Sequence, residues 1–495
     1  MTGRPALAGL AAAWLALAVP AAAQDAPRPY SPGTPQPAAD ATGAPPRPPI
    51  LPADADYAFL DGTPRTGTDR LKRVPLGEGL RFSLSGLARA TADRRDNLGF
   101  GLVPGGDIAL STRLNLYAGL DFRGRVRIFA AFKQAGRDAT GFETLLGDDV
   151  DLALHQGFVE LSWGDALGRA PQDALVRVGR QELHYGAGRM LAVREPPAAR
   201  DDFDGALVRL RTSGAAGARI TDLFAFDEVI DASETAANEP DDGLWGVYTS
   251  APLGGTLWGK RHALDLYYIG QRLEDADYAA GVADETRHSL GLRWHSDGGH
   301  AGPGLSWDVE TALQIGNSVR ADRGADDRVA AWMAAGALGW GWDGAGSPTL
   351  LFEAAATSGD GDPADGTNGT FRVPHPPIQY YGETTFLAPG NLLALQASLA
   401  LRPREGLTVT PGATGFWRLS EADGVYKLGG AVRRDAAGDG RFLGWEANLD
   451  WSWQISEAVT LSGKAGRFFA NGSYLSQSGP AEDVGRIRLD LTARF

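Results

Sequence analysis

Arginine is the residue type in this chain whose spacing most clearly suggests chemistry. Arginines recur at alternate positions, as in Arg123, Arg125 and Arg127, and again in Arg209 and Arg211. On a β-strand, residues two apart point to the same face at a spacing of about 6.8 Å, so such arginines would form a ladder of guanidinium groups. A guanidinium stays charged and binds a carboxylate through a planar fork. Such a ladder could pass a carboxylate-rich chain from one group to the next.

The same alternation assigns further charged residues to this face. The arginines that we expect there are Arg113, Arg123, Arg125, Arg127, Arg177, Arg209, Arg211, Arg293, Arg486, Arg488 and Arg494. The acidic candidates on this face are Glu160, Asp265, Asp308, Glu310, Glu446 and Asp450. The arginines could select a passing anion, or their pairs with these carboxylates could merely brace neighbouring strands. The pattern leaves both interpretations open.

Several other kinds of chemistry are excluded or disfavoured. The chain has no Cys, which excludes thiolate catalysis, Cys-ligated zinc, iron–sulfur clusters and a lipid anchor on Cys. Its 7 His form no evident ligand cluster, and Asp360, Asp362 and Asp365 lack the downstream Glu of an EF-hand calcium loop, so we expect no metal and no cofactor. A net charge of −14 disfavours nucleic-acid binding. No nucleophile elbow or phosphate loop is present, and we expect no enzyme.

Two-residue alternation dominates the chain from Leu80 onward and indicates β-strands with one apolar and one polar face. In the last segment Ile487, Leu489 and Leu491 alternate with Arg488 and Asp490. About 18 such segments can be counted. They lie near residues 80–92, 107–119, 122–134, 154–164, 173–183, 204–212, 218–226, 244–253, 261–272, 287–296, 304–315, 328–342, 348–357, 391–401, 407–417, 443–454, 458–470 and 485–495.

The connections between these segments alternate in length. Long polar stretches follow odd-numbered segments, at 135–153, 184–203, 227–243, 358–390 and 418–442. Short turns follow even-numbered segments, at 120–121, 213–217, 343–347, 402–406 and 455–457. An outer-membrane barrel has this arrangement, with short periplasmic turns, long external loops and both ends of the barrel in the periplasm.

The predicted fold class is therefore all-β, a transmembrane antiparallel β-barrel of about 18 strands in the bacterial outer membrane. Only alternate residues of such a barrel face lipid, which is compatible with a hydrophobic content of only 43%. Tryptophans near segment ends, among them Trp163, Trp340 and Trp445, fit interfacial aromatic girdles. A soluble sandwich or propeller also alternates, but it does not call for outward tryptophans or for long loops at one end.

The N-terminal region precedes this barrel. Arg4 and the apolar run 6–19, followed by Ala23, predict a signal peptide over residues 1–23. Residues 24–79 form a Pro/Ala-rich periplasmic leader, and its part up to Asp56 has too few large apolar residues to predict a folded core. A plain spacer is the favoured interpretation, with docking onto the barrel as the alternative. The barrel itself is predicted to occupy residues 80–495.

One motif resembles a known family. The segment VGRQELHYGAGR (178–189), followed by Arg194-Glu195-Pro196 and by FDGA (203–206), resembles the hallmark of the alginate export family of outer-membrane barrels. The stretches SGDGD (358–362), GTF (369–371) and GRFF (466–469) resemble later parts of the same domain. The resemblance spans most of residues 80–495 and implies a monomeric 18-stranded barrel with an arginine-lined constriction that lets a polyuronate leave the cell.

The resemblance adds site residues to the list. Arg180, Arg189 and Arg194 match the family segment, which implies that they line the constriction. Arg180 shares parity with Val176 and Val178, so it lies at the rim unless a bulge near Gly179 changes the register. We expect the loop 184–203 to fold inward and to place Arg189 and Arg194 in the path, although an ordinary external loop also fits its composition.

The expected function is passive export of an anionic polysaccharide, alginate or a similar polyuronate, through an outer-membrane channel. A general or anion-selective diffusion porin for small solutes is the alternative, and an outer-membrane enzyme or adhesin is a more distant third. The expected partners are outer-membrane lipid, the barrel-assembly machinery through the terminal Phe495, and a periplasmic export scaffold.

Overall fold

A computed structural model places most of the chain. It describes residues 49–61, 67–139, 150–164, 172–193, 202–232, 235–238, 242–300, 302–322, 326–344, 346–377, 381–384, 387–427, 432–436 and 438–495. The predicted signal peptide, residues 24–48 of the leader, and Arg194 lie outside the described residues. No helix in the described part is long and apolar enough to cross a membrane.

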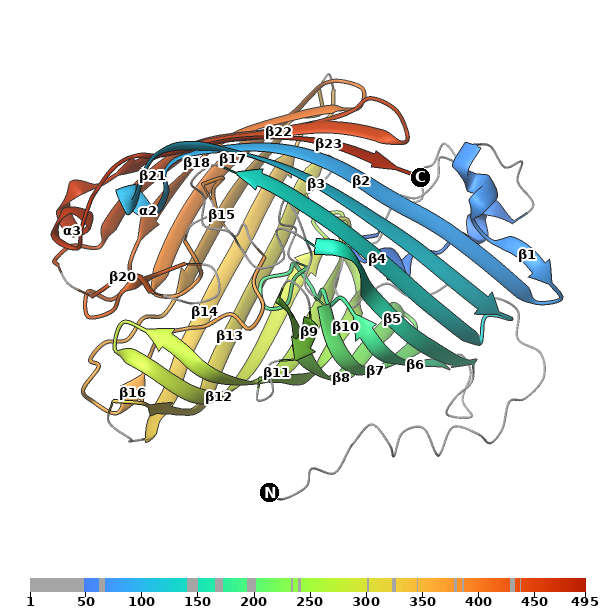
Figure 1. The fold of residues 1–495 in the computed structure, drawn as a ribbon, viewed down its shortest axis with the longest axis horizontal. Helices are drawn as coiled ribbons and strands as arrows, with labels where there is room; N and C mark the ends of the chain where they lie inside the picture. Colours follow the sequence, from blue (N-terminus) through green and yellow to red (C-terminus); the bar gives the residue numbers. More distant parts are fainter. Residues whose placement is uncertain are drawn as a thin grey trace.

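One antiparallel sheet forms the body of the protein (Figure 1). Of its 21 strands, three are short additions, namely β1 (Val74–Gly77), β9 (Thr235–Asn238) and β16 (Thr367–Asn368), and the other 18 form a closed barrel. The first nine barrel strands are β2 (Leu80–Asn97), β3 (Val103–Phe122), β4 (Val126–Ala139), β5 (Val150–Gly164), β6 (Gln172–Gln181), β7 (Asp202–Gly214), β8 (Gly217–Ala232), β10 (Gly243–Leu257) and β11 (Lys260–Tyr278). The remaining nine are β12 (Gly281–Ser296), β13 (Gly304–Arg320), β14 (Asp326–Gly341), β15 (Thr349–Thr357), β17 (Leu392–Arg404), β18 (Leu407–Trp417), β21 (Phe442–Gln454), β22 (Val459–Ala470) and β23 (Val484–Arg494).

The first and last barrel strands pair with each other and close the barrel. β2 and β23 are antiparallel over a continuous register from Leu87↔Arg494 to Asp96↔Gly485. Phe495 extends this pairing, because its backbone N–H and C=O both bond to Gly86 at 3.1 Å. Within the described residues each of the 18 barrel strands therefore pairs with a neighbour on both sides, which is the condition for a β-structure to reside in lipid.

The smaller elements are not strands of the barrel wall. They are the 3₁₀ turns η1 (Pro52–Asp54), η2 (Ala58–Leu60) and η3 (Gly67–Leu71), the helices α2 (Leu98–Gly101) and α3 (Gly472–Gln477), and the separate hairpin of β19 (Val425–Tyr426) and β20 (Val432–Arg434). The helix α3 and the hairpin belong to one end of the barrel, and β1 and the C-terminus to the other (Figure 1).

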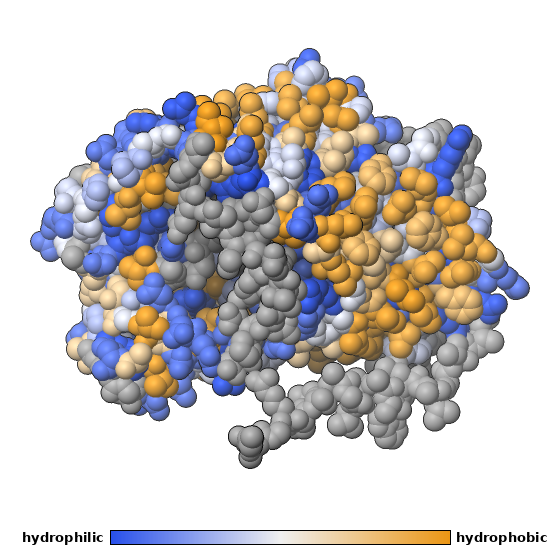
Figure 2. Space-filling view, viewed as in Figure 1, coloured by the Kyte–Doolittle hydropathy of each residue, from blue (hydrophilic) through white to orange (hydrophobic). Residues whose placement is uncertain are grey.

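The alternation predicted from the sequence separates the two faces of the wall. On β23, Ile487, Leu489 and Leu491 are about half exposed on the outside, whereas Arg488 and Asp490 are buried inside. Apolar residues cover much of the outer wall on the right of Figure 2. Trp340 on β14 and Trp445 on β21 are exposed near opposite ends of the barrel, as aromatic girdles require. This outer face provides the surface that lipid covers.

The two ends of the barrel differ as the loop lengths predict, with one correction. The short turns share an end with the start of β2 and with Phe495, which is the periplasmic end of an outer-membrane barrel. At the opposite end, however, the connections 98–102, 279–280 and 321–325 are short. There the strands continue past their predicted limits, as β11 does to Tyr278. Beyond the membrane the apolar alternation ends, but the backbone pairing between neighbouring strands continues.

Two external connections fold back into the barrel. Residues 182–193 and 370–377 meet through a parallel bridge between Leu191 and His375, and the N–H of Ala192 donates to the carbonyl of His375 at 3.0 Å. Leu191 is fully buried in an apolar cluster that these segments share with strands of the wall. The described part of the predicted constriction loop therefore lies inside the lumen.

The leader also enters the lumen, from the periplasmic end. Ala53 packs in a cluster with Tyr117, Phe129 and Phe158 of the wall. Asp54 is 3% exposed. The prediction of an unstructured spacer up to Asp56 is therefore wrong for this part, because a few apolar residues and one carboxylate suffice when the barrel supplies the surrounding surface.

Candidate functional site

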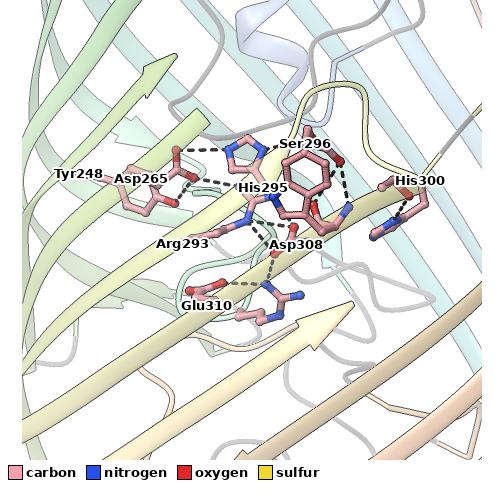
Figure 3. Close-up of polar contacts among 11 residues, drawn as sticks. Tyr248, Asp265, Arg293, His295, Ser296, His300, Asp308 and Glu310 are labelled. Carbon is pink, nitrogen blue, oxygen red and sulfur yellow. Dashed lines mark hydrogen bonds and ion pairs between the residues drawn. The ribbon is translucent and has the colours of Figure 1, made fainter. Parts of the chain in front are cut away.

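The lumen carries its charges in discrete clusters. One cluster surrounds Arg293 on β12, whose guanidinium donates to Asp308 at 2.6 and 3.0 Å and to Asp265 at 2.9 Å. The hydroxyl of Tyr248 donates to Asp265 at 2.9 Å, and His295 lies 3.4 Å from the same carboxylate. Figure 3 shows Arg293 between Asp265 and Asp308. Residues that face each other on β11, β12 and β13 thus form one buried network.

Arg189 joins this network from the inward-folded loop. Its guanidinium lies 2.8 Å from Asp308 and 2.9 Å from Glu310, both on β13. The side chain of Arg189 is 14% exposed. The loop is therefore held by the carboxylates of the opposite wall, and Arg189 stands in the lumen as the family resemblance implies.

A second cluster lies near the periplasmic end. It consists of Arg127, Glu160, Arg177, Arg209 and Asp222 on five consecutive strands, β4 to β8, and is called here the periplasmic arginine cluster. Arg127 donates to Glu160 at 2.9 Å, Arg177 lies 3.5 Å from Glu160, and Arg209 donates to Asp222 at 2.7 and 2.8 Å.

Further charge pairs line the strands where the barrel closes. Arg486 on β23 binds both carboxylate oxygens of Asp93 on β2 at 2.9 Å. Arg488 donates to Asp490 at 2.8 Å, and Asp490 accepts a hydrogen bond from Thr91. These contacts tie the first strand to the last strand across the lumen side of the seam.

Some predicted residues lie elsewhere. Arg180 has the outward parity and pairs with Asp204 through two contacts of 2.9 Å. The register of β6 runs unbroken through Gly179, so no bulge turns Arg180 inward. Its assignment to the constriction is wrong, because it lies at the rim and on the outer face.

One periplasmic turn accounts for two more. Arg123 and Arg125 belong to the tight turn between β3 and β4, where Arg123 has φ 54° and stacks on Phe122, so neither forms part of a strand ladder. Arg211 lies on β7 with the same parity as Arg209, near the periplasmic end of the strand, and faces Asp173 at 3.8 Å. Arg113 is buried on the lumen face of β3, as alternation predicts.

The base of the inward loop carries a contact that the sequence did not reveal. His155 on β5 is fully buried, with Nδ1 at 2.8 Å from Asp202 and Nε2 at 2.9 Å from Glu182. Two carboxylates on both ring nitrogens call for an imidazolium that donates twice. The sequence marked Glu182 and His184 only as part of a family motif. It gave no sign of the contact with His155, which lies 27 positions from Glu182.

Farther along the connection that carries the second inward segment, residues 382–384 are held by a buried carboxylate. Glu446 accepts hydrogen bonds from the backbone N–H groups of Glu383 and Thr384. Gly382, at φ +71°, allows this approach, since a Cβ there would lie 2.7 Å from the Glu446 oxygens. Burial raises the pKa of Glu383 to about 7; Lys464, at 3.1 Å, opposes the rise, and Asp450 adds to it.

The SGDGD stretch has a structural role in the same loop. The N–H of Asp360 and the hydroxyl of Thr370 both donate to Asp423, at 2.9 and 2.7 Å. Burial raises the pKa of Asp360 to about 6, and the carboxylates of Asp423 and Asp365 reinforce the rise. Within the described residues, no group of three or more His, Asp or Glu could hold a metal ion.

The predicted arginines therefore do not form a ladder of uncompensated charge. Most of those on the lumen face contact a carboxylate, which is what bracing predicts. A guanidinium has five N–H donors, so a wall carboxylate and a passing anion can share one arginine. The lumen arginines can therefore exchange a wall carboxylate for the carboxylate of a passing anion. Their ion pairs can also hold the strands and loops in place.

A closed 18-stranded barrel with an apolar outer wall and a charged interior is a channel of the bacterial outer membrane. This chain belongs to the alginate export family, whose family model matches residues 80–483. The description of this family is that of an export channel.

Solved structures show the same fold at low sequence identity. A BenF-like porin from Pseudomonas fluorescens Pf-5 aligns with a TM-score of 0.54 at 11% identity, over 84% of this chain and 98% of that one. OccK2 (OpdF) of Pseudomonas aeruginosa aligns with a TM-score of 0.54 at 13% identity, over 84% and 97%. OccAB1 of Acinetobacter baumannii aligns with a TM-score of 0.51 at 12% identity, over 87% and 99%. No curated protein sequence matches this chain.

Proposed function

We propose that this barrel lets an anionic polysaccharide, alginate or a similar polyuronate, leave the cell passively. Membership of the alginate export family across residues 80–483 carries this proposal. A polyuronate offers one carboxylate for each sugar unit, and the lumen offers guanidinium groups at several heights along its wall.

The ion pairs of the lumen suit weak and repeated binding. A uronate carboxylate that approaches Arg189 competes with Asp308 and Glu310, which hold that guanidinium in the resting protein. Exchange of one carboxylate for another changes the number of charge-assisted hydrogen bonds little, so each step is shallow. Transport needs such shallow steps, because entry must be favourable while exit must stay fast.

The second candidate is an anion-selective or general porin for small solutes. The pairing of most lumen arginines with carboxylates favours it, since bracing alone explains those contacts. In that case the arginines would set only a charge preference, and the length of a solute would not change how strongly it blocks the channel.

Single-channel recording in planar bilayers separates the two candidates. Purified full-length protein is exposed to mannuronate oligomers of increasing length and to neutral malto-oligosaccharides of the same lengths. We expect anion-selective current that hexamannuronate blocks and maltohexaose does not, with block that strengthens with uronate length. Current that responds to no uronate, or responds equally to monomer and hexamer, would favour the porin.

A pair of variants tests the role of the lumen. Arg189→Ala removes a guanidinium inside the lumen, and we expect it to weaken hexamannuronate block by roughly tenfold, the usual scale for loss of a charge-assisted hydrogen bond. Arg261→Ala removes the same charge from a side chain that is 77% exposed at a periplasmic turn, and it should leave the block unchanged. Equal effects of both variants would point to net charge rather than to a binding track.

The remaining partner predictions belong to this proposal. We infer that Phe495 serves as the recognition signal for the barrel-assembly machinery, that the barrel works as a monomer and binds no nucleic acid, and that a periplasmic scaffold delivers the polymer. Co-purification from membranes after mild crosslinking, compared between wild type and a Phe495→Ala variant, tests the first of these.

A further inference from the structure

The leader segment, residues 51–60, occupies the periplasmic arginine cluster. Nη2 of Arg177 donates to Oδ1 of Asp54 at 3.1 Å, and Nη1 of Arg209 lies 3.9 Å from Oδ2 of the same residue. Nη1 of Arg127 donates to the carbonyl of Ala53 at 2.6 Å. Each of the three arginines of the cluster thus contacts either the carboxylate of Asp54 or the backbone beside it.

The local sequence shapes this contact. Pro52 stands at the first position of the turn η1, where its fixed φ suits a helical turn and its missing N–H costs nothing. The N–H of Asp54 bonds to the carbonyl of Leu51 at 2.9 Å and closes the turn. Farther along, Asp61 pairs with Arg73 next to β1, which anchors the outer end of the segment to the wall.

The charges of the cluster balance only when Asp54 is present. The wall contributes three arginines and two carboxylates to the cluster as defined above, which leaves one positive charge. Asp54 supplies the third carboxylate. The leader therefore places a single carboxylate where the wall has one cation in excess, deep enough that Asp54 is 3% exposed.

Aromatic rings complete the surface that the leader covers. The guanidinium of Arg177 lies 4.4 Å from the centre of the Phe158 ring, and that of Arg127 lies 4.9 Å from the centre of Phe129. Ala53 packs in the same cluster as both rings. Guanidinium groups beside flat apolar rings can hold a sugar unit by its carboxylate and by its apolar face together.

We propose that the periplasmic arginine cluster is a uronate-binding subsite at the entrance of the channel, and that the leader segment occupies it as an internal substitute until a uronate chain displaces it. This inference rests on the proposed function. A polymer that leaves the cell reaches the periplasmic end first, so the leader would stand where the chain must enter.

A thiol reporter tests this inference in the full chain. Because the chain has no Cys, Ala53→Cys introduces a single reactive group at a position that is 2% exposed. The rate of labelling by a neutral maleimide is measured for protein in lipid nanodiscs. We expect slow labelling alone, a rise of roughly tenfold or more with saturating hexamannuronate, and no change with maltohexaose.

A second pair of variants tests the carboxylate. Asp54→Asn, combined with the reporter, should label fast without any sugar, because an amide cannot replace the charge-assisted bonds. Asp56→Asn is the matched control, since within the described residues Asp56 bonds locally, accepting from the N–H of Ala58 at 2.9 Å, and it should label like the parent reporter. If Asp54→Asn fails to fold, as judged by loss of heat-modifiable migration, the hexamannuronate response of the parent reporter still decides.

The labelling and current measurements together distinguish failure of the subsite from failure of the proposed function. Labelling that hexamannuronate leaves unchanged, while hexamannuronate still blocks current, overturns the subsite and leaves the proposed function standing. Absence of both block and faster labelling overturns the proposed function and this inference with it. Equal acceleration by maltohexaose overturns the assignment of the subsite to carboxylates.

Discussion

Arg189 and Asp308 face each other across the lumen at 2.8 Å, although one belongs to a loop and the other to the barrel strand β13. The contact ties the inward loop to the wall at a point where Asp308 is also held by Arg293. Because each carboxylate near Arg189 has a second donor, Arg293 for Asp308 and Tyr267 for Glu310, loss of Arg189 does not leave them without a partner.

Arg189→Ala should therefore release the loop without unfolding the barrel. We expect protease cleavage within residues 182–193 to become roughly tenfold faster, because about one charge-assisted interaction is lost. The measurement is limited proteolysis of protein in nanodiscs, with Arg261→Ala as the control. Unchanged cleavage would mean that the other contacts of the loop, such as the burial of Leu191 and the bond of Ala192 to His375, hold it without Arg189.

The contact of His155 with Glu182 and Asp202 predicts a large loss of stability. His155→Ala leaves two buried carboxylates without their shared cation, and breaking a buried ion pair in this way costs about 3–5 kcal/mol. Urea unfolding from lipid vesicles measures this free energy. His288→Ala is the control, because His288 is only partly buried and bonds to the hydroxyl of Tyr268 rather than to a carboxylate, and it should cost about 1 kcal/mol. If His155→Ala costs no more unfolding free energy than the control, His155 does not form a buried ion pair with Glu182 and Asp202.

The connection that carries the second inward segment also carries Glu383, and the stability of its inward arrangement should depend on pH. Burial raises the pKa of Glu383 to about 7 from an ordinary value of 4.5, so the inward arrangement binds a proton more tightly than the released loop. Its stability is then fully present below about pH 4.5 and is lost as the pH rises through 7.

We expect proteolysis of this loop to increase between pH 5 and pH 8, by up to about tenfold for each unit that separates the two pKa values. Glu383→Gln should flatten this pH dependence. Glu421→Gln changes a side chain that is 47% exposed in a neighbouring loop, and its profile should follow wild type. A pH dependence that survives in Glu383→Gln would assign the effect to another carboxylate, such as Asp360.

The outward face of the last strand predicts a lipid contact. Leu489, at the centre of β23, is 46% exposed on the outer wall, and Leu489→Arg should cost about 2–4 kcal/mol of unfolding free energy in vesicles. Ser476→Arg, at an exposed position of the helix α3, should change it by no more than about 0.5 kcal/mol. Equal costs in detergent and in lipid would argue against a position at the membrane centre.

Much of the wall could be predicted from the sequence alone. The alternation of Ile487 and Leu489 with Arg488 and Asp490 determined which side chains face lipid, because successive residues of a strand point to opposite faces whatever surrounds them. The same rule placed Arg177 and Arg209 inside. It failed for Arg123 and Arg125, which lie in a turn where parity has no meaning.

The tertiary structure decided what those inward charges contact. Asp54 meets Arg177 across 123 positions of sequence, and Arg189 meets Asp308 across 119. Parity assigns a residue to a face but does not specify its neighbour around the barrel, its height along the axis, or what fills the lumen. The leader and the inward loops lack periodicity and large apolar content, so their own sequences predict no folded state. They are ordered because the closed barrel surrounds them with partners that strands far apart in the chain bring together.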